Sequence, residues 1–110
     1  MNELLELAAK AAGMTIDTHY VDGGASVWEG ERHHSDWIPD WNPLDDDGDA
    51  LRLAVKLEIV VEYRRDASAA FAYNYARCLG IGENNKNLDP YAATRRAIVR
   101  AAAEIGRNMT

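Results

Sequence analysis

The sequence is poor in the residue that most often cross-links small proteins. It has one cysteine, Cys78, among 110 residues, so no internal disulfide can form and no cysteine-based zinc site can be built. No activating residue stands near Cys78 in the sequence, and we expect it to be a small apolar residue of the core. A reducing cytoplasm is the expected compartment.

Long apolar runs are also missing. Every apolar stretch is interrupted by charge well before the roughly 18 residues that a membrane-spanning helix needs. The chain begins Met1-Asn2-Glu3, which is acidic where a signal peptide would be basic. We therefore expect neither secretion nor contact with a membrane.

Positive charge is in deficit. Twelve Lys and Arg residues stand against 18 Asp and Glu, for a net charge of −6, which argues against a general nucleic-acid binder. The charge is also segregated. Residues 36–49 hold six aspartates and no basic residue, whereas residues 95–107 hold four arginines and one acid.

The overall composition is that of an ordinary globular protein. The apolar share is 47% and the charged share 27%. A globally disordered chain would contain fewer apolar residues, so we expect this chain to fold. A chain of this length buries roughly 60–70% of its unfolded surface on folding. We expect residues 1–110 to form a single domain.

Apolar residues at helical spacing predict three helices. The first covers residues 2–12 and ends at Gly13, a residue suited to a left-handed cap. The second follows Pro43, carries aspartates in its first turn and runs to about residue 57, with Leu51, Ala54 and Val55 expected inside. The third starts at Asp89-Pro90, and Gly106 is expected to end it.

Alternating apolar and polar residues predict about four strands, and glycine-rich or aromatic-rich stretches predict loops. The strands are expected at 14–21, 25–29, 58–64 and 68–77, and the loops at 30–43 and 80–88. The element order is then αββαββα. The predicted fold is α+β, with a small, mostly antiparallel sheet and helices packed on one face.

Three blocks of the sequence carry a resemblance. They are LLELAAKAAG at 4–13, WNPL at 41–44 running into DDGDALRLAVKL at 46–57, and ATRRAIVRAAAEIG at 93–106. In this order they resemble a family of small, functionally uncharacterised proteins of tailed bacteriophages and prophages. The resemblance covers about forty residues and implies a phage source and a bacterial host cytoplasm. It implies no activity.

Candidate metal ligands occur in two places. Asp45, Asp47 and Asp49 have the spacing that opens a calcium loop, but Ala50 and Lys56 stand where such a loop needs glycine and a bidentate acid. His33 and His34 are adjacent and lack the spacing of a zinc motif. Solvated helix-end charges and an exposed loop are the simpler interpretations, and we expect no metal.

No catalytic motif occurs in the chain. Phosphate-binding glycine loops of the Walker and Rossmann types are missing, and so is a nucleophile elbow. We therefore expect no catalytic residue, no cofactor and no enzymatic activity.

The candidate binding residues are charged or aromatic. Arg96, Arg100 and Arg107 are expected in line on the outward face of the last helix, where Arg100 can pair with Glu104. Arginines there are most often only solvated, but they suit phosphate or an acidic protein. Trp37 is expected to be exposed in its loop, whereas Trp41 is expected to be structural.

The predicted function is that of a non-enzymatic phage or prophage accessory protein that binds another protein of the phage or host. Self-association into a homodimer is a further possibility, because opposite charges and an exposed strand edge favour pairing. Two alternatives are nucleic-acid binding through the arginine stripe, and an acidic decoy in which Asp45, Asp46 and Asp47 imitate DNA phosphates. A third is a small metal-dependent enzyme built on His33 and His34.

Overall fold

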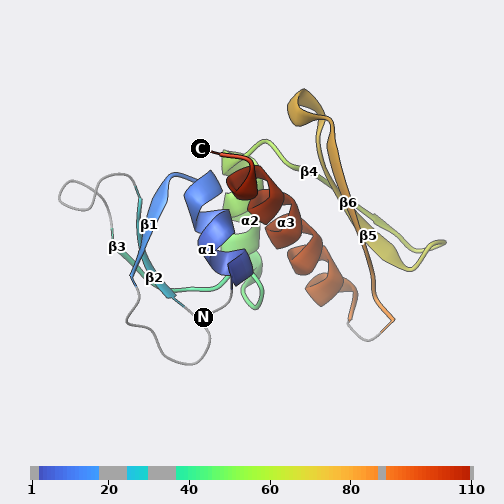
Figure 1. Ribbon diagram of the computed structural model, residues 1–110. Coiled ribbons are helices and arrows are strands. Elements are labelled where there is room, and N and C mark those ends of the chain that lie inside the picture. The colour runs from blue at the N-terminus through green and yellow to red at the C-terminus, as the bar shows by residue number, and fades with distance from the viewer. Residues whose placement is uncertain (1–2, 18–24, 30–36, 87–88, 110) are drawn as a thin grey trace.

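The computed structural model describes residues 3–17, 25–29, 37–86 and 89–109, and gives no side-chain detail for residues 15–40. Three helices lie between two antiparallel sheets (Figure 1). The helices are α1 (Glu3–Ala11), α2 (Asp47–Lys56) and α3 (Pro90–Arg107). The α+β class predicted from the sequence is confirmed. Along the described residues, no helix combines the length and apolar character that crossing a membrane requires.

The first sheet contains three strands in the order β1-β2-β3. They are β1 (Met14–Asp17), β2 (Ala25–Glu29) and β3 (Trp37–Trp41). β1 and β2 were predicted, but β3 lies in the segment expected to be a loop, and that prediction was wrong. Pro39 obscured it, because proline suggests a break, yet proline is tolerated in an edge strand such as β3.

The second sheet has the order β4-β5-β6 and packs against α3 (Figure 1). Its strands are β4 (Val60–Arg64), β5 (Ala69–Asn74) and β6 (Leu79–Asn84), with a 3₁₀ turn, η1 (Tyr75–Arg77), between the last two. A loop was predicted at 80–88, but most of this segment belongs to β6, and that prediction was wrong. The strand predicted at 68–77 ends at Asn74, and its last three residues form η1. The described residues therefore form six strands in two sheets, not about four in one.

The helix ends follow the expected capping rules. The Asp89 carboxylate accepts a 2.7 Å hydrogen bond from the backbone N–H of Ala92, and Pro90 occupies the first turn of α3. Asp46 caps α2 in the same way through the N–H of Asp49, at 2.8 Å. Gly13 after α1 has φ +73°, the left-handed conformation that only glycine adopts without strain.

The core is built mainly from alanine. One face of α3 is lined by fully buried small side chains, and the inward residues Ala70 and Ala72 of β5 are equally buried. Small side chains let backbones approach closely, so α3 can touch both α1 and the second sheet. The larger core side chains come from the other elements: Leu5, Trp41, Leu53, Ile59, Ile98 and Val99.

The last helix does not end at Gly106 as predicted. Gly106 is buried inside α3, which continues to Arg107. Its role is to let α1 approach α3, because a Cβ atom at this position would lie 2.0 Å from the carbonyl oxygen of Leu7.

Candidate protein-binding surface

Two large apolar side chains of α2 face solvent. Leu51 is 63% exposed and Val55 is 71% exposed, although helical periodicity predicted both to be buried. The buried face of α2 is formed by Ala50, Leu53 and Ala54 instead. Residues four apart lie one above the other on a helix, so Leu51 and Val55 form an apolar ridge along its outer side.

A groove of about 570 Å³ runs beside this ridge. It lies where α2 meets the end of α1 and the first sheet, and most of its lining is apolar. The residues that line it are Ala12, Met14, Trp41, Leu51, Arg52, Leu53, Val55 and Lys56. We call the ridge and this groove the α2 surface.

A second hollow, of about 330 Å³, lies on the other side of Leu51. Val61 of β4 and Tyr91 and Ile98 of α3 line it, together with the first turn of α2. Leu51 thus stands between two concave apolar regions. Contiguous exposed apolar patches mark contact surfaces far more often than single exposed residues do.

Two basic side chains flank the groove. Arg52 donates a 2.7 Å hydrogen bond to the buried carboxylate of Asp49, which also accepts a hydrogen bond from the N–H of Asn42 at 2.9 Å. These contacts hold Arg52 along the groove edge. Lys56 lies one turn further along α2 and also lines the groove.

The aspartates proposed to imitate DNA phosphates are tied to the fold. Asp46 is the N-cap of α2, Asp47 forms a 2.6 Å ion pair with Arg95, and Asp45 accepts a hydrogen bond from the Asn42 side chain at 3.2 Å. All three remain exposed. Their arrangement is that of a helix N-terminus stabilised by negative charge.

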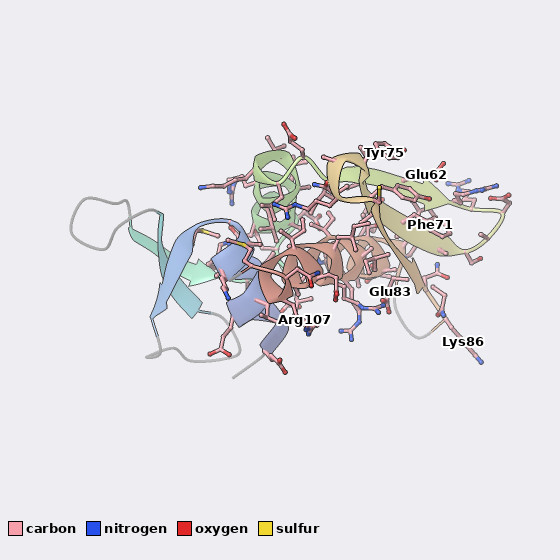
Figure 2. All side chains as sticks on the ribbon, turned by 45° about the horizontal axis from the view of Figure 1, so that its top comes forward. Glu62, Phe71, Tyr75, Glu83, Lys86 and Arg107 are labelled. Carbon is pink, nitrogen blue, oxygen red and sulfur yellow. The ribbon has the colours of Figure 1, made fainter. Side chains whose placement is uncertain are left out.

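The arginine stripe of α3 lies near the surface as predicted, but its partners differ from the prediction. Arg96 and Arg100 both bind the carboxylate of Glu83 on β6, Arg96 at 3.3 Å. Figure 2 shows Glu83 on the α3 side of the sheet. The predicted pair between Arg100 and Glu104 does not form, because Glu104 binds Arg107 at 2.7 Å.

Other predicted residues lie apart from this surface or outside the described part. Trp37 is the first residue of β3, and its side chain is not described. His33 and His34 lie outside the described residues. Trp41 is buried, as expected of a structural residue, whereas Cys78 is exposed and has φ +53° at the end of η1, so the core assignment was wrong.

Within the described ranges, no group of three or more His, Cys, Asp or Glu residues is placed to hold a metal ion. No sequence pattern marked Leu51, Val55 or Tyr91 as binding residues. Their apolar character fits a core position equally well, so the pattern alone could not separate the two roles.

Comparison with known proteins leaves the surface as the main guide to function. No family model, no curated protein and no solved structure matches the chain.

Proposed function

We propose that this chain is a non-enzymatic accessory protein of a bacteriophage or prophage, and that it acts by binding a host or phage protein through the α2 surface. The observation that carries the proposal is the exposure of Leu51 and Val55 beside an apolar groove of about 570 Å³. Neither side chain contributes to the core, and leaving both in water forgoes the free energy that their burial would release.

The chemistry of the α2 surface favours a particular kind of partner. An apolar groove suits an amphipathic segment that inserts two or three apolar side chains. We therefore expect the partner to present two or three apolar anchors along one side of such a segment.

The test is a tagged pull-down from bacterial host lysate with wild-type protein and with Leu51→Glu/Val55→Glu. Glutamate is a good helix former, and both positions are exposed, so the double variant should keep the fold. It should lose the protein that the wild type enriches. Tyr75→Glu is the matched control, since Tyr75 is equally exposed but lies in η1, between β5 and β6, and lines neither of the hollows beside Leu51.

A nuclease-treated arm separates the alternatives. Enrichment that survives nuclease and requires Leu51 and Val55 supports the proposal. Enrichment that nuclease removes would point to nucleic-acid binding by the arginine stripe. If the α2 double variant retains the same partner, the binding site lies outside the α2 surface. Neutralising Asp45, Asp46 and Asp47 would then test the acidic decoy.

A further inference from the structure

The second sheet has an open edge at β4. This strand pairs with β5 only, and in the described part of the chain no backbone hydrogen bond joins its other edge. Val60 is 44% exposed and Val61 is 38% exposed, and successive strand residues point to opposite faces. The edge therefore offers unpaired backbone groups and apolar side chains on both faces.

Proteins usually protect such an edge against pairing with another chain. They use proline, lysine, a bulge or a charge that points inward. β4 has the sequence VVEYR, which contains no proline or lysine, and its register against β5 is continuous. Its two charges, Glu62 and Arg64, point outward and have opposite signs.

We propose that β4 pairs antiparallel with β4 of a second copy of this chain, in the register centred on Tyr63. In that register Glu62 lies opposite Arg64 of the second copy, and Arg64 lies opposite Glu62 of the second copy. Two cross-strand ion pairs form around one twofold axis, as an isologous contact requires. The two three-stranded sheets become one continuous sheet of six strands.

The neighbouring registers lack this complementarity. A register centred on Glu62 places two like charges directly opposite each other, which is destabilising. A register centred on Val61 places each Glu62 opposite an apolar Val60. Charge therefore selects Tyr63 as the centre of the pairing.

The inner face of the sheet offers a second contact at the same place. A hollow of about 230 Å³ lies beside Tyr63 and is lined also by Arg65, Pro90, Tyr91 and Thr94. Tyr91 is 71% exposed there. Because Tyr63 lies on the axis, the hollow of each copy, with Tyr91 beside it, lies next to the hollow of the other copy. Tyrosine is enriched at the centres of protein interfaces.

Intramolecular contacts do not prevent this pairing. Arg64 binds Asp66 at 2.9 Å, but both side chains are more than half exposed. An exposed ion pair of this kind is worth little, so Arg64 can exchange Asp66 for Glu62 of the second copy. Glu62 lies on the solvent side of the sheet, with Phe71 and Tyr75 (Figure 2). Among the described residues, no hydrogen bond or ion pair holds its side chain.

The test is to measure the mass of the protein in solution by sedimentation velocity over a series of protein concentrations. The wild type should approach twice the chain mass of 12.2 kDa. Glu62→Arg and Arg64→Glu should each weaken the dimer, roughly tenfold to a hundredfold in dissociation constant, because both symmetric pairs change from opposite to like charges. The double variant E62R/R64E should recover the wild-type dissociation constant.

A mixture of the two single variants gives the sharpest readout. Glu62→Arg carries two basic residues on its edge, and Arg64→Glu carries two acidic ones. The mixture should therefore form a heterodimer that is more stable than the homodimer of either variant. Tyr91→Ala should weaken all of these dimers.

Two results would overturn the proposal: a wild type that stays monomeric throughout the series, or a dimer that the single reversals leave unchanged. The proposal goes beyond the α2 surface, and Val55→Glu should dimerise normally, because Val55 lines the α2 groove but not the hollow that Val61 and Tyr91 line. Loss of the partner in a pull-down and loss of the dimer are therefore separate failures.

Discussion

Gly106 of α3 sits against the backbone of Leu7 in α1, so close that a Cβ atom would lie 2.0 Å from the Leu7 carbonyl oxygen and 2.9 Å from its carbonyl carbon. No side-chain rotation relieves a clash with backbone. Glycine at 106 thus sets the distance between the two helices that carry most of the alanine core.

Gly106→Ala should therefore destabilise the protein. The helices must separate, and overpacking of this kind costs about 1–3 kcal/mol, which outweighs the gain of about 1 kcal/mol from replacing a helical glycine. Urea unfolding measures the difference. Gly48→Ala is the control: its Cβ would lie 3.2 Å from the side-chain ends of Arg52 and Asp46 and would meet no backbone. These ends need to shift by only a few tenths of an ångström, so the variant should cost much less than Gly106→Ala. Equal effects at the two glycines would contradict the close approach of α1 and α3.

The two leucines of α2 should differ sharply in their contribution to stability. Leu53 is buried and Leu51 is mostly exposed. Leu53→Ala removes a core side chain and should cost about 2–5 kcal/mol, whereas Leu51→Ala should change the free energy of unfolding by no more than about 0.5 kcal/mol. Thermal or urea unfolding of both variants decides this. A large loss at Leu51 would mean that α2 is rotated and that the α2 surface is core.

The aromatic residues of β5 should hold β6 in place. Phe71 and Tyr73 lie side by side with nearly parallel rings, 6.3 Å between centroids, opposite Gly82 and Gly80 of β6. The rings lie against these glycines, since a Cβ at Gly82 would lie 3.2 Å from the Phe71 ring. Phe71→Ala should cost about 1–2 kcal/mol and should speed hydrogen exchange at the amides of β6.

Tyr75→Ala is the control for the aromatic row. Tyr75 stacks on Tyr73 at 5.9 Å but lies outside the strand and is largely exposed. Its removal should leave β6 exchange almost unchanged. If the exchange of β6 increases as much for Tyr75→Ala as for Phe71→Ala, stacking along the row and not contact with the glycines supports the strand.

These contacts also explain which elements could be predicted from the sequence. α3 was predictable because its signals are local: an aspartate N-cap, a proline in the first turn and apolar residues at helical spacing. β6 was not, because Gly80 and Gly82 have no side chains to form an alternating pattern, and what covers them comes from β5. The partner of Arg96 and Arg100 was missed for the same reason, since Glu83 lies in the strand that was read as a loop.

The candidate site shows the opposite difficulty. A periodic apolar pattern predicts which residues avoid water, but it does not say whether another part of the chain is available to cover them. Leu51 and Val55 have the spacing of core residues, and no described segment of the chain packs over them.

In the monomer, where Arg64 pairs with Asp66, the carboxyl group of Asp66 should titrate at lower pH than an ordinary aspartate. The hydrogen bond from Arg64, aided by its positive charge, lowers the pKa of Asp66. Because the folded-state pKa is the lower one, the small stabilisation is present above the unfolded-chain pKa and is lost as the pH falls through the folded-state pKa. Carboxyl chemical shifts measure this directly. Arg64→Ala should return the pKa of Asp66 toward its usual value, and an unchanged midpoint would contradict the ion pair.

Glu83 should neutralise part of the positive charge of the arginine stripe. Its single carboxylate binds both Arg96 and Arg100, so Glu83→Gln removes one negative charge and releases two guanidinium groups for phosphate. Binding to a short DNA duplex should become tighter, with a salt dependence steeper by about one to two charges. Glu104→Gln, which releases only Arg107, should give a smaller gain. If neither variant binds DNA more tightly than the wild type, the stripe serves to fasten α3 to β6, and the nucleic-acid alternative loses its only structural support among the described residues.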